Sequence, residues 1–317
     1  MIITSLLIVL GFSSLIFGAN WLVDGASSLA KKNNISDLVI GLTIVAFGTS
    51  APELVVNTVA SYTGLSDIVF GNIIGSNNFN LFVILGIAGL IYPITVQSST
   101  AWKEIPLSLM VSIVLFILAN NFFINQNLEI SRLDGIILLV FFLCFLYYVF
   151  KQLQQEKTTA ILAETKSNYK IWGLIIVGIA GLIIGGKLVV DNSIAMATEL
   201  GVSQKIIGLT IIAAGTSLPE LMTSIVAALK KYSDIAIGNV IGSNIFNVLL
   251  ILSISSFVNP VKYDPNFNQE LLILIGGTVF LLIAMFTGKR KKLDRWEACI
   301  LLSFYLMYTT YLVAKEI

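Results

Sequence analysis

The sequence predicts an all-α membrane protein with ten transmembrane helices, arranged as two inverted five-helix repeats. Three observations support this fold class: the composition is strongly apolar, long apolar runs recur from end to end, and two polar motifs occur twice at one fixed spacing. Of the 317 residues, 56% are hydrophobic and 12% are charged, and the mean hydropathy is +0.91. These values are far from those of a soluble domain, so the lipid bilayer is the expected environment.

Ten apolar runs are long enough to cross about 30 Å of hydrocarbon as helices. They lack the alternation of outer-membrane strands, so helices are expected rather than a barrel. The first run is too long for a removable signal peptide and lacks its basic start, so it counts as the first helix. The expected spans are 2–29, 38–60, 68–91, 104–121, 134–150, 171–196, 205–229, 235–258, 269–287 and 296–314.

The distribution of Lys and Arg predicts how the helices are oriented. With the N-terminus outside, fourteen of the nineteen basic residues fall in inner loops, four fall outside, and Lys187 lies within the sixth span. The positive-inside rule therefore places both termini on the extracytoplasmic side. Without a signal peptide or an organelle address, the simplest location is a prokaryotic inner (cell) membrane, which the chain crosses many times.

The composition also excludes several classes of function. A net charge of +1 gives no indication of nucleic-acid binding. The chain has no histidine, which excludes His-ligated metal sites and any Ser-His hydrolytic centre. We therefore expect neither an enzyme nor a bound cofactor.

An internal repeat divides the chain into two halves. The segment GLTIVAFGTSAPELVV at 41–56 matches GLTIIAAGTSLPELMT at 208–223 in eleven of sixteen positions. DIVFGNIIGSNNFN at 67–80 matches DIAIGNVIGSNIFN at 234–247 in ten of fourteen, at the same offset of 167 residues. The halves are expected at 1–150 and 171–317, joined by a cytoplasmic linker at 151–170. Because each half has five spans, the second enters the membrane from the opposite side, as in alternating-access transporters.

The repeated GTSxPE motif combines groups that are unfavourable inside a membrane helix. Pro52 and Pro219 cannot donate a backbone hydrogen bond, so each is expected to interrupt its helix, and the neighbouring glycines are expected to add backbone freedom. Freed carbonyl groups at this depth are tolerated only where they line a cavity or coordinate something. The two motifs are therefore predicted to meet at a site near the middle of the bilayer.

Oxygen-bearing side chains surround each break. In each GTSxPE motif a Thr and a Ser lie four and three residues before the Glu, on one helix face. In each GNxIGSNxFN motif a Ser lies four residues before an Asn. Hydroxyl, amide, carbonyl and carboxylate oxygens together suit hard cations, Ca²⁺ and Na⁺ above all. The side chains are Thr49, Ser50, Glu53, Ser76, Asn80, Thr216, Ser217, Glu220, Ser243 and Asn247.

The cost of burying charge also indicates a bound ion. A charged residue at the centre of a membrane helix costs about 2.5–3.5 kcal/mol on insertion scales. Lys187, expected beside Asp191, is the one basic residue away from the ends of a predicted span and cannot neutralise both Glu53 and Glu220. A bound cation is the natural counter-charge. Asp24 and Asp191 lie near helix ends, where we expect them to cap a helix or to form an ion pair.

Structural roles remain open for several of these residues. Protonated glutamates could bridge helices, and the Ser and Thr hydroxyls could bond back to their own helix. Asn80 and Asn247 could simply hold helices together, and Asn72 and Asn239 are expected to be helix-packing amides.

The paired motifs resemble the signature repeats of Na⁺/Ca²⁺ exchangers in the calcium/cation antiporter superfamily, of the prokaryotic type without regulatory domains. The resemblance covers both halves and all ten spans. It implies that the ten side chains above bind ions from the second, third, seventh and eighth helices, with the backbone carbonyls of Ala46 and Ala213 as further ligands. Ca²⁺ would lie between the two glutamates, and Na⁺ would occupy that region and flanking sites built from Ser76 and Ser243.

The resemblance also implies a secondary active antiporter with Na⁺ and Ca²⁺ as substrates and a monomeric state. In the family, the first and sixth helices slide across a rigid core. Some relatives carry Asp at the position of Asn247, and its absence here argues against K⁺ co-transport. If more than two Na⁺ exchange for each Ca²⁺, export of Ca²⁺ moves charge and responds to voltage.

Three other functions remain open. An H⁺/Ca²⁺ antiporter would use the same carboxylates, although neither half has the GNxxE-type repeat of proton-driven relatives. A cation channel could use the same oxygens, but inverted repeats favour alternating access. An intramembrane hydrolase would rest only on the hydroxyls of Ser50 or Ser217.

Overall fold

The computed structural model describes residues 2–120, 128–155, 167–200, 213–287 and 291–316. Up to residue 155, the elements are α1 (Ile2–Asn33), α2 (Asp37–Ile40), η1 (Gly41–Val45), α3 (Ala46–Thr49), α4 (Ala51–Tyr62), α5 (Ser66–Asn78), η2 (Phe79–Ile84), α6 (Leu85–Ile91), β1 (Ile94–Thr95), η3 (Thr100–Glu104), α7 (Ile105–Ala119), β2 (Glu129–Ile130) and α8 (Arg132–Gln155). After it come α9 (Asn168–Glu199), α11 (Ala213–Gly215), α12 (Leu218–Leu229), α13 (Ser233–Phe246), η5 (Asn247–Ile251), α14 (Leu252–Val258), β3 (Val261–Lys262), η6 (Pro265–Phe267), α15 (Asn268–Ala284), β4 (Lys292–Leu293) and α16 (Arg295–Glu316).

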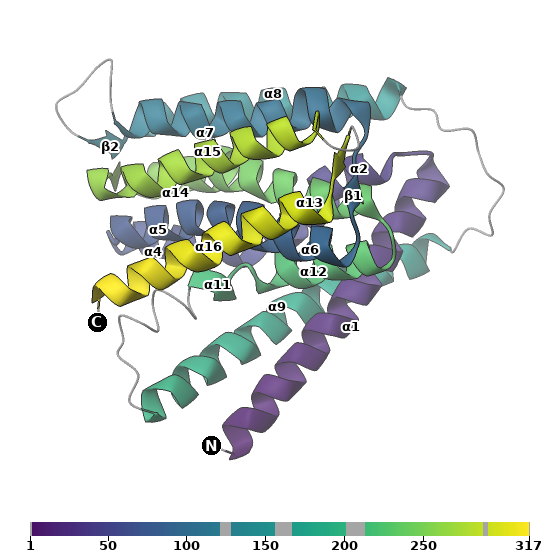
Figure 1. Ribbon diagram of the computed structural model, residues 1–317, viewed down its shortest axis with the longest axis horizontal. Helices are drawn as coiled ribbons and strands as arrows, with labels where there is room; N and C mark the ends of the chain where they lie inside the picture. The colour runs from purple at the N-terminus through teal and green to yellow at the C-terminus, as the bar shows by residue number, and fades with distance from the viewer. Residues whose placement is uncertain (1, 121–127, 156–166, 201–212, 288–290, 317) are drawn as a thin grey trace.

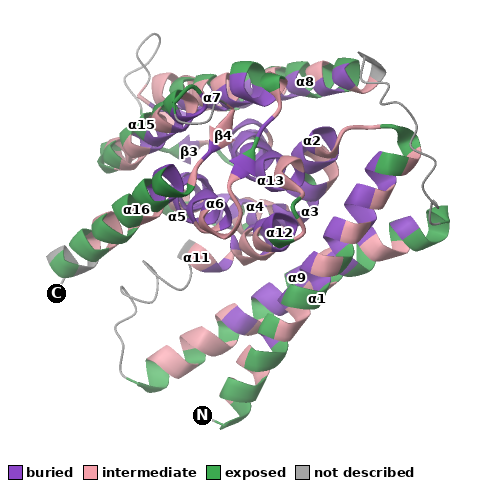
Figure 2. Ribbon diagram, turned by 45° about the vertical axis from the view of Figure 1, so that its right-hand side comes forward, coloured by how far each residue is buried: buried purple, intermediate pink, exposed green. Residues whose placement is uncertain are grey.

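Most helices run roughly parallel in one bundle, and α1 and α9 cross its side obliquely as a pair (Figure 1). The interior holds two continuous helices, Ser66–Ile91 and Ser233–Val258. In their most apolar windows 83% and 94% of the residues are buried, against 22% in α1. Buried residues accordingly gather at the centre in Figure 2, while α15 and α16 expose their outer faces. The core of the bundle is therefore built by helices that carry the repeated GNxIGSNxFN motif.

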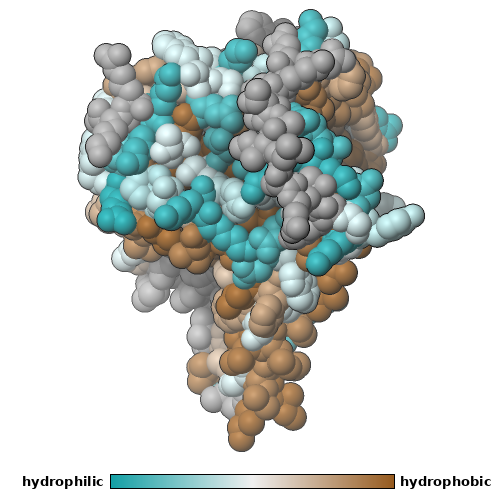
Figure 3. All heavy atoms as spheres, turned by 90° about the vertical axis from the view of Figure 1, so that its right-hand side faces the viewer, coloured by the Kyte–Doolittle hydropathy of each residue, from teal (hydrophilic) through white to brown (hydrophobic). Residues whose placement is uncertain are grey.

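The surface and the helix lengths both fit a protein that spans a membrane. Hydrophilic residues gather on one end of the bundle, and hydrophobic residues dominate the part that protrudes below it (Figure 3). Among the described residues, seven helices are long and apolar enough to span a membrane, or eight if the bent pair Asp37–Thr49 and Ala51–Tyr62 is one span. The expected span 296–314 is helical as α16, whereas the first residues of the span 205–229 lie outside the described residues.

Two short antiparallel strand pairs connect parts of the chain that are far apart in sequence. Ile94 of β1 is paired with Leu293 of β4, and Ile130 of β2 is paired with Val261 of β3. Each pair joins a loop of the first repeat to a loop of the second. The two halves are thus linked by backbone hydrogen bonds as well as by helix packing.

Both GTSxPE motifs contain a helix break, as predicted. Ser50 (φ −81°, ψ 7°) and Ser217 (φ −87°, ψ 8°) share the same non-helical backbone conformation. The helices on either side of Ser50 are bent by 48°. Pro52 and Pro219 lie in the first turn of α4 and α12, where a helix needs no backbone donor. The break therefore falls at the serine two residues before each proline.

The glycines of these motifs serve close packing, and their expected contribution to backbone freedom stays a prediction. Among the described glycines only Gly64 has a positive φ. A Cβ atom on Gly48 would lie 2.5 Å from the side chain of Ile179, and one on Gly215 would lie 2.4 Å from Val190. Both contacts come from α9, so these glycines let α9 approach both breaks.

The helices α1 and α9 pack backbone against backbone. A Cβ atom on Gly18 would lie 2.8 Å from the carbonyl oxygen of Gly178, and one on Gly178 would lie 2.6 Å from the backbone nitrogen of Leu22. The hydroxyl of Ser14 also donates a hydrogen bond to the carbonyl of Gly181 at 2.7 Å. Because glycines let the two backbones meet directly at these positions, α1 and α9 form one tightly packed unit.

Candidate cation-binding site

The two helix breaks bring the two glutamates together in the core. Glu53 and Glu220 lie in the first turns of α4 and α12, and each is only 1% exposed. Ser50, three residues before Glu53, contacts Glu220, and Ser217, three residues before Glu220, contacts Glu53, so the two carboxylates lie close together and would repel each other when ionised. A positive charge between them would relieve this repulsion.

Each glutamate contacts the serine of the other half. The hydroxyl of Ser50 donates to Oε1 of Glu220 at 2.9 Å, and the hydroxyl of Ser217 donates to Oε1 of Glu53 at 3.4 Å. Ser243 of α13 also approaches Oε1 of Glu220, at 3.5 Å, and lies 3.0 Å from the hydroxyl of Ser50. The expectation that one motif's hydroxyls would accompany its own carboxylate is therefore wrong for the serines. Since each serine lies at a break, it turns towards the opposite motif.

The two threonines are held by asparagines that the sequence analysis had assigned to helix packing. Thr49 donates to Oδ1 of Asn239 at 3.1 Å, and Nδ2 of Asn72 donates to the hydroxyl of Thr216 at 3.0 Å. Asn239 also donates to the backbone oxygen of Glu220 at 3.2 Å. These asparagines thus fix the orientation of candidate ligand residues across the halves.

A second layer of hydrogen bonds fixes these asparagines. Asn57 donates to Oδ1 of Asn72 at 2.6 Å and to the backbone oxygen of Glu53 at 2.7 Å. At the equivalent positions of the other half, Asn239 donates to the hydroxyl of Ser224 at 3.0 Å. The sequence carried a signal for Asn72 and Asn239, because both recur at the offset of 167 residues inside the GN pair of their motif.

Asn80 and Asn247 use their nitrogen atoms to join the halves. Nδ2 of Asn80 donates to Oδ1 of Asn244 at 3.0 Å, and Nδ2 of Asn247 donates to Oδ1 of Asn77 at 2.9 Å. Asn80 lies within the π-helical turn η2, and Asn247 begins η5, a type of turn that is frequent at functional sites. Asn77 and Asn244 were missed, although both recur directly after the serine of GSN.

Several candidate ligand oxygens are buried without a hydrogen-bond partner among the described residues. Buried polar atoms are normally paired, so each such atom calls for an explanation. Five of these oxygen atoms lie on the four motif segments. Two belong to the glutamates, two to the last asparagine of each GNxIGSNxFN motif, and one to a serine. These atoms are Oε2 of Glu53, Oγ of Ser76, Oδ1 of Asn80, Oε2 of Glu220 and Oδ1 of Asn247. Carboxylate, amide and hydroxyl oxygens together match the ligands of Ca²⁺ and Na⁺.

The remaining predicted ligands are backbone carbonyls. The oxygen of Ala46 accepts from the backbone nitrogen of Ser50 at 3.0 Å and from the hydroxyl of Thr49 at 3.3 Å. One contact of Thr49 is therefore a hydrogen bond back to its own helix, as the structural alternative for the hydroxyls expected. Ala213 begins α11 directly after the undescribed residues 201–212, and the role of its carbonyl stays a prediction.

The model of the sodium/calcium exchanger protein family matches residues 3–151 and 170–314, which together include every motif described above. The chain belongs to the sodium/calcium exchanger family. Members of this family are transporters. The match leaves out residues 152–169, most of the segment expected as a linker.

Individual relatives agree with this family. The chain is 37% identical over 302 residues to the inner membrane protein YrbG of Escherichia coli (strain K12), covering 92% of this chain and 90% of the relative. It is 31% identical over 339 residues to the sodium/calcium exchanger MaX1 of Methanosarcina acetivorans, covering 96% of each. The solved structure of the sodium-calcium exchanger NCX_Mj, soaked with Na⁺ and Sr²⁺, superposes with a TM-score of 0.83 at 31% identity, covering 96% of this chain and 97% of that one.

Proposed function

We propose that this protein is a secondary active antiporter that exchanges Na⁺ for Ca²⁺ across a cell membrane. Ca²⁺ binds between Glu53 and Glu220, and Na⁺ ions occupy the same region and the flanking oxygens of Ser76 and Ser243. The serines and threonines of the two breaks complete the ligand set with the side chains of Asn80 and Asn247. Family membership and the similarity to MaX1 support this choice of ions.

The observation that carries the proposal is the set of five candidate ligand oxygens, two of them on carboxylates, that are buried without a hydrogen-bond partner among the described residues. In the described part of the chain neither glutamate has a Lys or Arg partner. Two ionised glutamates would give the site a charge of about −2, which one Ca²⁺ balances. Burying this charge without a counter-ion would cost several kcal/mol. Because Na⁺ and Ca²⁺ need the same carboxylates, they compete, and competition couples their transport.

We propose an alternating-access mechanism in two inverted repeats of five helices, 1–150 and 171–317, joined by the linker 151–170. The offset of 167 residues and the two separate segments matched by the family model support this division. The helix pair α1 and α9 is the element that slides across the core. We expect both termini outside, a prokaryotic inner membrane and a monomer. With more than two Na⁺ per Ca²⁺, export of Ca²⁺ is electrogenic and responds by about 2.3 kcal/mol per charge per 100 mV.

The decisive experiment measures Ca²⁺ uptake into three preparations of proteoliposomes, in which an outward gradient of Na⁺, of H⁺ or of K⁺ is imposed separately. The wild-type protein is expected to take up Ca²⁺ only with the outward Na⁺ gradient. Glu53→Gln and Glu220→Gln should each abolish this uptake. Glu104→Gln is the matched control, because Glu104 is equally buried but lies on η3, away from the motifs. It should retain uptake.

Each alternative gives a different result. Uptake driven by a pH gradient in sodium-free medium would replace the proposal with H⁺/Ca²⁺ exchange. Steady single-channel currents would indicate a channel. Uptake that survives replacement of both glutamates would refute the assignment of the site.

A further inference from the structure

A cavity of about 420 Å³ lies between α9 and the two helix breaks. Pro52, Pro219 and Thr216 line it from the breaks, and Lys187 and Asp191 line it from α9. Thr216 is a candidate ligand that Asn72 orients, so the cavity borders the proposed cation site. An ion that approaches through this cavity passes the side chains of α9.

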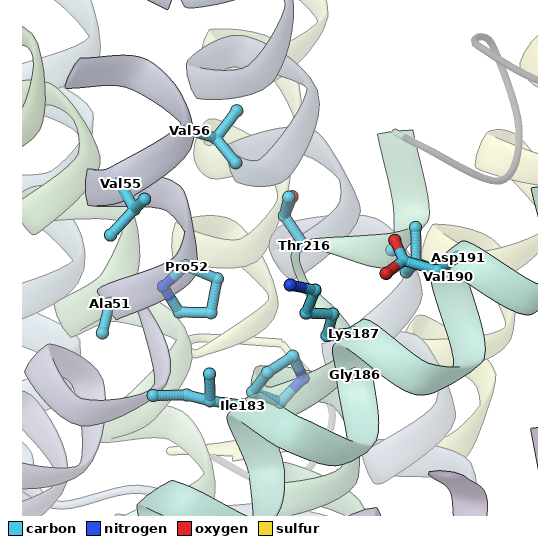
Figure 4. A pocket seen from close by; sticks show the side chains of 12 residues that line it. Ala51, Pro52, Val55, Val56, Ile183, Gly186, Lys187, Val190, Asp191 and Thr216 are labelled. Atoms are coloured by element: carbon cyan, nitrogen blue, oxygen red, sulfur yellow. The ribbon is translucent and has the colours of Figure 1, made fainter. Parts of the chain in front are cut away.

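The ammonium group of Lys187 points into this cavity, towards Pro52 and Thr216 (Figure 4). The carboxylate of Asp191, one turn further along α9, lies on the opposite side of the Lys187 side chain from Pro52 (Figure 4). The walls are mostly apolar, formed by residues such as Val55 and Ile183. Apolar walls screen a charge poorly, so the field of Lys187 extends along the cavity.

The two halves of the chain differ at the position of Lys187. The position equivalent to Lys187 in the first half, 167 residues earlier, is Asn20. The position equivalent to Asp191 is Asp24, which pairs with Lys230, directly after α12, at 2.8 Å. At α1 a carboxylate therefore holds a lysine of the core, whereas at α9 the long helix itself carries a lysine that faces the cavity.

We propose that Lys187 is a specificity-determining residue that disfavours Ca²⁺ relative to Na⁺ at the site reached through this cavity. The inference rests on the proposed function. A fixed positive charge repels a divalent ion with twice the energy of a monovalent ion at the same position. Because a dissociation constant depends exponentially on the binding free energy, removing this charge should change the affinity for Ca²⁺ by the square of the factor by which it changes the affinity for one Na⁺.

Three variants test this relation by calorimetric titration of the purified protein with each ion separately. Lys187→Gln should tighten Na⁺ binding about 3-fold per ion and Ca²⁺ binding about 9-fold, as expected for one charge several ångströms away in a partly screened site. Lys187→Arg keeps the charge and should behave as the wild type. Asp191→Asn removes the opposite charge and should weaken Ca²⁺ binding more than Na⁺ binding. All charge effects should shrink between 0.01 M and 1 M ionic strength.

The control is Lys170→Gln, which removes a charge at the other end of α9, outside the cavity, and should change neither affinity. Equal factors for Na⁺ and Ca²⁺, or no change in either affinity, would overturn the inference. If Lys187→Gln fails to fold, Asp191→Asn still tests the inference, because it removes a negative charge and should shift both affinities in the opposite direction. If the wild type exchanges Na⁺ for Ca²⁺ and only these shifts are missing, the inference fails alone; if the wild type does not exchange, the proposed function fails.

Discussion

Lys230 at the end of α12 donates a hydrogen bond to Asp24 of α1 at 2.8 Å and thereby ties the oblique helix pair to the core. The same ammonium group reaches the backbone oxygen of Asn20 at 3.3 Å. The pairing agrees with the expectation that Asp24 caps a helix or forms an ion pair. The contact lies on the long helix that the proposed mechanism requires to slide.

Lys230→Gln should therefore change the rate of exchange more than it changes stability. The two side chains are 27% and 43% exposed, so the ion pair contributes below about 1 kcal/mol to folding. If the pair must open when α1 slides, its loss should raise the initial rate of Na⁺-driven Ca²⁺ uptake by about 2–5-fold, which corresponds to a barrier lowered by about 0.4–1 kcal/mol. Lys292→Gln, which removes the local pair with Asp294, is the control. An unchanged uptake rate would mean that the ion pair between Lys230 and Asp24 does not open during transport.

Gly178→Ala should destabilise the protein by separating α1 from α9. The added Cβ atom would lie 2.6 Å from the backbone nitrogen of Leu22, so two backbones must move apart, at a cost of about 1–3 kcal/mol. Thermal unfolding in detergent should show a melting temperature several degrees lower. Gly173→Ala on the same helix meets nothing within 4 Å and should leave it unchanged or slightly raised. Equal melting temperatures for both variants would contradict the close packing.

Ser50→Ala should weaken Ca²⁺ binding strongly because it removes a hydroxyl that is proposed as a ligand and lies beside the buried carboxylate of Glu220. A contact between a hydroxyl and a charged group is worth about 1.5–3 kcal/mol, so its loss from the ion-bound state should raise the dissociation constant by about 10–100-fold. Ser217→Ala should have a smaller effect, because its contact with Glu53 is longer, at 3.4 Å. Ser112→Ala, which removes a buried hydroxyl that donates to the carbonyl of Ser108 in the same helix, serves as the control for calorimetric titration with Ca²⁺. A larger effect from Ser217→Ala would contradict the geometry.

Asn247→Asp should make the stability of the protein depend more on Ca²⁺. The new carboxylate would face Oδ1 of Asn77, which now accepts from Nδ2 of Asn247 at 2.9 Å, and would add a third acid near the site. With Ca²⁺ removed by a chelator, the melting temperature should fall, and added Ca²⁺ should raise it by more than in the wild type. Asn80→Asp has the equivalent contact at 3.0 Å and should behave similarly. A Ca²⁺-induced increase equal to that of the wild type in both variants would show that these side chains lie outside the field of the bound ion.

The sequence predicted the repeated motifs, their helices and the positions of the breaks because these features depend on local chemistry. A proline cannot donate within a helix, and polar side chains in an apolar run need partners. Both rules act within one segment, and the breaks at Ser50 and Ser217 follow from them. The duplication further indicated that the two motifs act together.

Tertiary structure decided which groups meet, because contacts between helices depend on their relative register and rotation. Helical spacing assigned Ser50 to Glu53, yet the break turns it towards Glu220 of the other half. Asn72 and Asn239 support candidate ligands because helices from the two halves interleave. The sequence by itself thus determined the kinds of oxygen available for a cation and where each helix is interrupted. Only the folded bundle decided how these oxygens are paired and that Lys187 faces the cavity leading to them, since no periodicity within one helix encodes what lies opposite it.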